Sequence, residues 1–187
     1  MRVYLAGPEV FLPDAREVLD RKIALTREAG LEPLAPGDLD EGPEGESRHE
    51  KGLRISRKNE ALMHAADAII ANLTPFRGVG ADPGTVYELG YMCGREKLAY
   101  GYTNVASNHF ERLVNYYDGQ MMQDEDGSLR GDDGLAVEHF DMADNLMLPG
   151  GIIARGGKLI ACDVDPEALY SDLTAFADCL ALLAARR

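Results

Sequence analysis

The chain alternates short apolar segments with longer amphipathic ones, and this order constrains its fold more than any other feature. Four short apolar segments predict strands, at residues 3–6, 31–35, 68–73 and 98–102. Apolar residues at helical spacing predict the helices between them, at residues 15–29, 50–66 and 85–96. Strands and helices that alternate in this way form a parallel sheet with helices on both faces. We therefore predict a doubly wound α/β sheet of about five mostly parallel strands.

The rest of the chain predicts additions to this sheet. Residues 110–117 and 137–154 read as helical, residues 159–162 as a last strand, and residues 166–185 as an amphipathic closing helix. The polar segment 36–48 reads as a loop, and the acidic, glycine-rich segment 118–133 as a surface insertion. Because 187 residues suffice for one core and no linker interrupts them, we expect a single domain over residues 1–187.

Charge and composition favour a small-molecule partner. The formal net charge is −13, which argues against a nucleic-acid polymer because phosphate binding requires clustered Lys and Arg. No apolar run is long enough to span a bilayer, and the N-terminal one breaks at Gly7-Pro8, too early for a signal peptide. The odd count of three cysteines suits a reducing compartment. We therefore expect a cytoplasmic protein without a membrane partner.

A single glutamate is the strongest candidate for chemistry. The stretch Asp82-Pro83-Gly84-Thr85-Val86-Tyr87-Glu88 places this carboxylate at the start of a predicted helix, after a strand and a glycine turn. Such turns bind ligands in open α/β sheets, and the first helical turn favours an ionised carboxylate. An ionised carboxylate can attack an electrophilic sugar carbon. The spacing of Thr85 and Glu88 equally fits a capping box, in which the glutamate only satisfies helix amides.

Three further polar residues are weaker candidates. Asp67 stands at the mouth of a predicted strand and Asp82 six residues before Glu88, so both are candidates to contact a hydrogen-bonding ligand such as a nucleobase. Both are equally ordinary turn or cap residues. Asn145 lies in an apolar helical pattern, where an amide is unexpected unless it is a satisfied core or cap residue.

Motifs for cofactors and metals do not match. The third glycine of a dinucleotide-binding G-x-G-x-x-G would fall at Pro83, and no Walker lysine follows the glycine-rich segment. The four histidines lack metal-ligand spacing. We expect neither a metal nor an organic cofactor.

Taken together, four segments resemble the nucleoside 2-deoxyribosyltransferases. They are VYLAGP at 3–8, ADAIIANLTPFRG at 66–78, DPGTVYELG at 82–90 and DNLML at 144–148. Their order and the interval from Asp82 to Glu88 are those of the family, and the match covers roughly residues 1–150. The resemblance implies a flavodoxin-like doubly wound sheet, in agreement with the alternation of strands and helices.

The resemblance also implies an exchange of the base on a 2′-deoxyribonucleoside. In this family the glutamate that matches Glu88 attacks C1′ and forms a covalent deoxyribosyl-enzyme. A tyrosine like Tyr4 hydrogen-bonds and holds that glutamate. Aspartates like Asp67 and Asp82 bind the base and help to protonate it as it leaves. The expected ligands are thus a deoxyribonucleoside and a free nucleobase.

Further substrate contacts are implied by the same segments. They are Gly7, Asn72, Gly84, Asn145 and Met147. In the family the asparagine reaches the sugar hydroxyls from a neighbouring subunit. The resemblance therefore implies a homo-oligomer, a dimer or higher, with shared active sites.

Two other functions stay open on the sequence. A nucleoside or nucleotide N-glycosidase would use the same glutamate with water as the acceptor, and Thr74 and Arg77 would be candidates for a 5′-phosphate site. A silent nucleoside-binding domain would bind the same ligands without turnover. The loops that differ from shorter relatives leave the base preference open.

Overall fold

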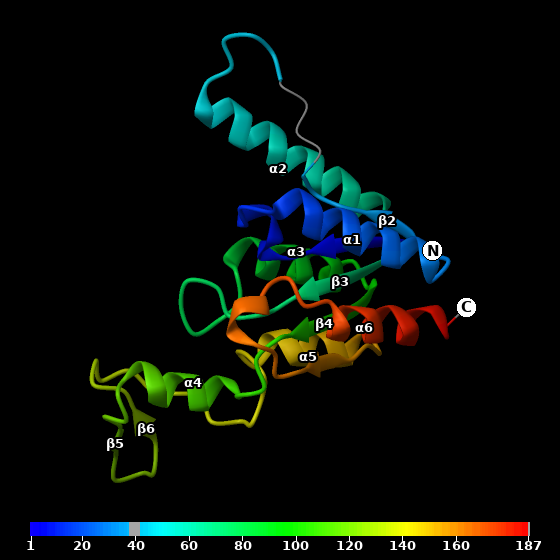
Figure 1. Cartoon of the computed structure of the whole chain (residues 1–187). Coiled ribbons are helices and arrows are strands. Elements are labelled where there is room, and N and C mark those ends of the chain that lie inside the picture. Colours follow the sequence, from blue (N-terminus) through cyan, green and yellow to red (C-terminus); the bar gives the residue numbers. More distant parts are fainter. Residues whose placement is uncertain (38–41, 187) are drawn as a thin grey trace.

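Five parallel strands form the centre of the computed structural model, which describes residues 1–37 and 42–186 (Figure 1). The strands are β1 (Arg2–Ala6), β2 (Glu32–Leu34), β3 (Ala68–Asn72), β4 (Leu98–Thr103) and β7 (Leu159–Ala161). They lie in the order β2-β1-β3-β4-β7, so that Val3 of β1 pairs with Pro33 on one side and Ala68 on the other. This is the flavodoxin-like strand order, and it confirms the predicted fold class.

Helices cover both faces of the sheet. On one face lie α1 (Ala15–Glu28) and α6 (Thr174–Ala184), and on the other lie α2 (Arg48–Ala65), α3 (Pro83–Gly94) and α5 (Met147–Ala154). Side chains alternate along β1: Val3 and Leu5 pack toward α1 and α6, whereas Tyr4 and Ala6 pack toward α2 and α3. Every residue of β3 is buried, as expected for a central strand covered on both sides.

Short local signals set the helix ends. Gly30 adopts a φ of 72° directly after α1, the left-handed conformation that glycine provides at low cost. Ser47 and Glu50 form a capping box at the start of α2. Part of the predicted polar loop, residues 38–41, lies outside the described residues.

A small lobe projects from the end of β4. It contains α4 (His109–Tyr116) and the antiparallel pair β5 (Met122–Gln123) and β6 (Leu129–Arg130), which lie away from the main sheet in Figure 1. The hairpin forms within the acidic segment 118–133, where the sequence predicted a surface insertion.

Two predicted helices are too long. Helix was expected over 137–154, but only α5 is helical. Before α5 the backbone bonds to side chains and not along a helix: Glu138 accepts a hydrogen bond from the backbone N–H of Leu146. Helix was also expected over 166–185. There the short 3-10 helix η2 (Pro166–Ala168) precedes α6, and the Asn104 side chain donates to the carbonyls of Leu169 and Asp172, which a continuous helix would use internally.

No helix in the described parts of the chain is both long enough and apolar enough to cross a bilayer.

Candidate active site

A cavity of about 520 Å³ opens where the strand order of the sheet reverses. From β1 the chain passes through the short 3-10 helix η1 (Pro8–Phe11) and α1 to the edge strand β2, whereas β3 leads through α3 to β4 on the other side. Ligands of doubly wound sheets bind in the crevice at this switch point, outside the carboxyl ends of the strands. The wall combines the turn after β1 with α1, α2 and α3, and includes Gly7, Leu19, Ile55, Asn59, Asp82 and Glu88.

Glu88 lines the cavity and is hydrogen-bonded to Tyr4, which is fully buried and does not itself line it. The hydroxyl of Tyr4, at the centre of β1, donates to Glu88 Oε1 at 2.6 Å. Burial raises the pKa of Glu88 to about 7; the bond from Tyr4 opposes that rise and the nearby Asp82 adds to it. Burial and the Glu88 carboxylate raise the pKa of Tyr4 far above its usual value, so Tyr4 remains a donor. The cavity thus contains a carboxyl group poised to ionise near neutral pH.

The cap of α3 is Asp82, not the glutamate. Asp82 Oδ2 accepts from the backbone N–H of Thr85 at 2.9 Å and from its hydroxyl at 3.1 Å, and Pro83 starts the helix. The capping-box interpretation of Glu88 is therefore wrong, because Thr85 occupies the third helical position. Asp82 itself is buried and lines the cavity beside Glu88 and Gly84. Asp82 and Glu88 therefore face one space, and of these two only Asp82 caps the helix.

Gly7 lines the cavity at the turn after β1, and only a glycine fits there. A Cβ atom at Gly7 would lie 1.9 Å from Glu9 Oε2 and 2.9 Å from the Cβ of Asn72. Glu9 and Asn72 therefore occupy the space that a side chain at position 7 would need. Gly84 has a similar place at the start of α3, where an added Cβ would meet Asp82 Oδ2 at 3.0 Å.

A fully buried polar network lies on the α1 side of this turn. Glu9 Oε1 accepts from Lys22 Nζ at 2.7 Å, from Tyr102 Oη at 2.9 Å and from Asn72 Nδ2 at 3.0 Å. The charged pair Glu9 and Lys22 was not predicted. The sequence carried one signal for it, because Lys22 falls on the buried stripe of α1 with Val18, where an apolar residue was expected.

Asn72, which the resemblance places among the substrate contacts, does not line the cavity of this chain. Its Nδ2 donates to Glu9, and its Oδ1 accepts from the backbone N–H and hydroxyl of Thr74 at 3.0 and 2.6 Å. The side chain is buried at the carboxyl end of β3 on the α1 side. It therefore supports the turn that borders the site.

Asp67 lies at the opposite edge of the sheet, so the structure separates it from the other candidates. It precedes β3, and its Oδ2 accepts from the backbone N–H of Arg2 at 2.8 Å while the Arg2 guanidinium lies 3.4 Å from Oδ1. In a parallel sheet the amino ends of all strands share one edge, and ligands bind at the other.

Among the described residues of α2, Asn59 is the polar one that lines the cavity. The sequence did not predict this role for Asn59, although it lies one helical turn after Ile55, which also lines the cavity.

Asn145 and Met147 do not line the cavity of their own chain. Asn145 Oδ1 accepts from the backbone N–H of Met147 at 3.1 Å at the start of α5, and its Nδ2 donates to Glu138 at 2.9 Å. The side chain of Met147 is 69% exposed. Both residues point to the surface that α5 presents.

Among the described residues, no group of three or more His, Cys, Asp or Glu side chains could hold a metal ion. The three cysteines are free thiols.

Comparisons with known proteins agree on one family. The sequence model of the nucleoside 2-deoxyribosyltransferase family matches residues 3–147. An uncharacterised protein of Schizosaccharomyces pombe is 34% identical over 98% of this chain and 89% of its own length. A 2-deoxyribosyltransferase structure from Leishmania mexicana is 29% identical, covers 95% of this chain and 97% of its own, and superposes with a TM-score of 0.62.

A conserved protein of Enterococcus faecalis shares the fold at 13% identity, with a TM-score of 0.52 over 91% of this chain and 96% of its own. The family and the fold together indicate an enzyme that handles nucleosides as a glycosyltransferase or a glycosidase.

Proposed function

Because this chain belongs to the nucleoside 2-deoxyribosyltransferase family, we propose that it transfers the 2-deoxyribosyl group of a deoxyribonucleoside to a free nucleobase. The observation that carries this proposal is Glu88 on the wall of the cavity at the switch point, where the buried Tyr4 holds it by a hydrogen bond. A carboxyl group with a pKa near 7 is ionised in a large fraction of molecules at neutral pH and is still shielded from water.

The transfer takes place in two displacements at C1′. First, ionised Glu88 attacks C1′ through an oxocarbenium-like transition state, and the C1′–N bond breaks with its electron pair going to the base nitrogen. The departing base takes up a proton, and the sugar remains as an ester on Glu88. A second base then attacks C1′ through its nitrogen, loses a proton and releases the Glu88 carboxylate. Two inversions leave the configuration at C1′ unchanged.

Each neighbour of Glu88 has a role in these steps. Tyr4 holds one carboxylate oxygen by its hydrogen bond, which leaves the other to attack. Asp82 lines the cavity beside Glu88, and we assign to it the proton exchange with the base. Asn59 offers both an amide donor and an acceptor on the α2 wall, which suits the hydrogen-bonding edge of a base. The Gly7 and Gly84 backbones permit close contact with the substrate.

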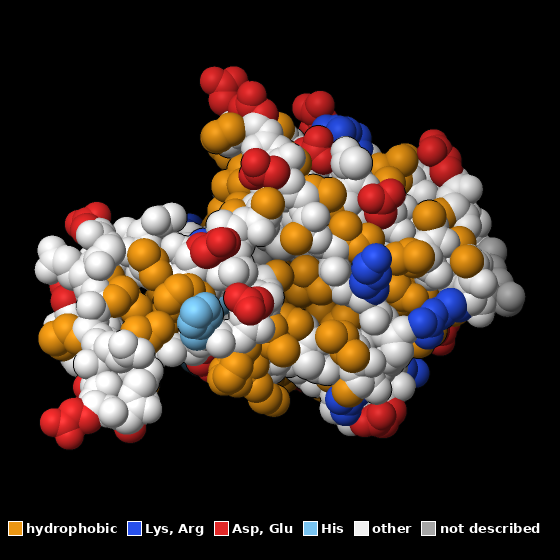
Figure 2. All heavy atoms as spheres, turned by 90° about the horizontal axis from the view of Figure 1, so that it is seen from below, with side chains coloured by type: hydrophobic (Ala, Val, Ile, Leu, Met, Phe, Trp, Pro, Cys, Tyr) orange, Lys and Arg blue, Asp and Glu red, His pale blue; other side chains and the backbone are white. Residues whose placement is uncertain are grey.

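Asn145 and Met147 reach a substrate only in a homo-oligomer, because neither lines the cavity of its own chain. Leu146, Met147 and Ile153 are exposed on or next to α5, and hydrophobic side chains gather on this face in Figure 2. An exposed apolar patch of this kind supports association with a second copy. We propose that such a copy supplies Asn145 and Met147 to the sugar side of the site.

The structure offers less support for a nucleotide substrate. The Thr74 side chain is buried, and its hydroxyl donates to Asn72 and accepts from the backbone N–H of Asn104. The Arg77 guanidinium stacks 4.7 Å from the ring centre of Phe76. Of the two residues proposed for a 5′-phosphate site, Thr74 is thus committed to the fold.

Product analysis tests the proposal. The protein is mixed with thymidine and adenine, alone and as Glu88→Ala and Glu60→Ala variants. Glu60 is a matched control, since it accepts a bond from Tyr87 at the same 2.6 Å but does not line the cavity. We expect 2′-deoxyadenosine from the wild type and Glu60→Ala and none from Glu88→Ala. Free deoxyribose without a new nucleoside would instead identify a hydrolase, and substantial exchange by Glu88→Ala would remove Glu88 as the nucleophile.

A further inference from the structure

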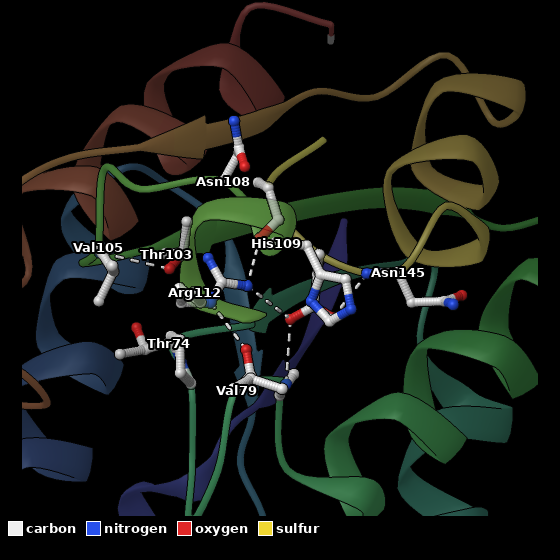
Figure 3. Close-up of polar contacts among 12 residues, drawn as sticks. Thr74, Val79, Thr103, Val105, Asn108, His109, Arg112 and Asn145 are labelled. Atoms are coloured by element: carbon white, nitrogen blue, oxygen red, sulfur yellow. Dashed lines mark hydrogen bonds and ion pairs between the residues drawn. The ribbon is translucent and has the colours of Figure 1, made fainter. Parts of the chain in front are cut away.

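One buried arginine connects three separate segments around the active site. Arg112 of α4 is 9% exposed, and its guanidinium donates to the carbonyls of Val79 at 2.7 Å, Ser107 at 2.5 Å and Ala143 at 2.7 Å (Figure 3). These carbonyls belong to the loop between β3 and α3, the loop before α4 and the loop before α5. The planar guanidinium has enough donors for three partners, whereas a lysine ammonium lacks this fixed geometry.

The partner of this arginine, Asp144, bonds to the backbone of Asn145 and of the residue before Asp82. Asp144 lies 3.5 Å from the Arg112 guanidinium and is itself buried. Its Oδ2 accepts from the backbone N–H of Ala81 at 3.1 Å, the residue directly before Asp82. Its Oδ1 accepts from the backbone N–H of Asn145 at 2.7 Å. One carboxylate therefore fixes the backbone next to both Asp82 and Asn145.

The same cluster contains a histidine. His109 Nδ1 is buried and lies 3.8 Å from Asp144 Oδ1, and the His109 side chain lies beside Arg112 in Figure 3. Arg112, Asp144 and His109 therefore form one cluster where the loops before α3, α4 and α5 meet.

We propose that Arg112 and Asp144 are positioning residues, which hold Asp82 and Asn145 in the arrangement that base exchange requires. They touch no substrate and act through the backbone of residues 79–82 and 143–145. The proposal rests on the proposed function, because it assigns a purpose to the place of Asp82 beside Glu88. A shift of about 1 Å in a group of this kind can lower a rate about a hundredfold.

The test compares three single variants and the Arg112→Lys/Asp144→Asn double variant in the thymidine and adenine exchange reaction. Arg112→Lys keeps the charge but not the three-way geometry, and Asp144→Asn keeps the size but removes the charge. Arg155→Lys is the matched control, since Arg155 also donates to a backbone carbonyl, that of Cys93 at 3.0 Å, and pairs with Glu96 away from the cavity. For each variant kcat, KM for thymidine and the melting temperature are measured.

We expect kcat to fall at least about tenfold in Arg112→Lys and in Asp144→Asn, with KM changed less than kcat and the protein still folded at the assay temperature. The double variant should be about as slow as the slower single variant, because the two residues act as one unit. Arg155→Lys should stay within about twofold of the wild type, since its bonds serve the fold alone.

Equal losses of kcat in Arg155→Lys and Arg112→Lys would overturn the positioning role, and so would a wild-type kcat in both Arg112→Lys and Asp144→Asn. In either case, base exchange by the wild type would still uphold the proposed function. If the wild type releases free base without exchange, the same kcat comparison is made on hydrolysis, and only the transferase proposal fails. Absence of all turnover by the wild type would contradict both.

Discussion

Two tyrosine–glutamate hydrogen bonds in the described part of the chain have the same length but different surroundings. Tyr4 donates at 2.6 Å to Glu88, which lines the cavity, and Tyr87 donates at 2.6 Å to Glu60 on the outside of α3 and α2. Tyr4 is fully buried, whereas Tyr87 is 56% exposed. Burial raises the pKa of Glu88 to about 7. The comparison indicates that burial of the pair at the switch point of the sheet, not the hydrogen bond itself, raises the pKa of the carboxyl group.

The largest expected difference between the buried and the exposed pair lies in how they affect the pH dependence of protein stability. The pKa of Glu88 is raised from 4.5 to about 7 in the folded state, so the folded protein binds the proton more tightly than the unfolded chain. Stability is therefore lost as pH rises from about 4.5 to about 7. Glu88→Gln removes this loss, and we expect it to gain about 1–3 kcal/mol over the wild type between pH 4.5 and pH 8.

Urea denaturation at a series of pH values measures this difference. A gap between wild type and Glu88→Gln that stays constant from pH 4.5 to 8 would show that the cavity does not perturb Glu88. The folded state must be checked by circular dichroism at each end of the range.

Removal of each tyrosine hydroxyl sharpens the comparison on activity. The bond from Tyr4 lowers the pKa of Glu88, so Tyr4→Phe should raise that pKa and move the acid limb of the pH–rate profile to higher pH. We expect about a tenfold lower rate at pH 7, because less Glu88 is ionised and its orientation is looser. Tyr87→Phe should leave the profile unchanged. Profiles of kcat/KM for both variants check this, and equal shifts would refute the assignment of the effect to the cavity.

A third hydrogen-bonded carboxylate should have the smallest effect. Asp67 is paired with Arg2, but it lies at the amino end of β3 and its side chain is 42% exposed. We expect Asp67→Asn to change the exchange rate by less than about twofold and to cost under about 1 kcal/mol of stability. Initial rates and urea midpoints measure both quantities. A large loss of kcat would show that Asp67 reaches the substrate and that the cavity is not the whole site.

The sequence predicts the sheet well because its signals are local. Apolar runs, helical spacing and glycines mark strands and helices before any tertiary contact forms, and the parallel order follows from their alternation. The prediction fails for residues 166–185, where a bond from Asn104 interrupts the helical pattern from a distance. Local periodicity contains no information on such a contact.

Only part of the candidate site can be predicted from the sequence, again because the rest depends on contacts between distant segments. Glu88 and Asp82 follow from a strand, a glycine turn and a helix start in succession. Asp67 precedes its strand, so the structure places it at the amino end of β3, away from the cavity that contains Glu88 and Asp82. Asn59 and Lys22 were missed because their importance depends on which helix faces turn toward the cavity and the buried network.

Direct detection of the deoxyribosyl-enzyme tests the central claim, that Glu88 is the nucleophile. The protein is mixed briefly with thymidine in the absence of an acceptor base, quenched, digested and mapped by mass spectrometry. The account predicts one added deoxyribosyl group on the peptide that contains Glu88, and no addition in the Glu88→Gln variant. An adduct on a different residue, or one that persists in Glu88→Gln, would contradict it.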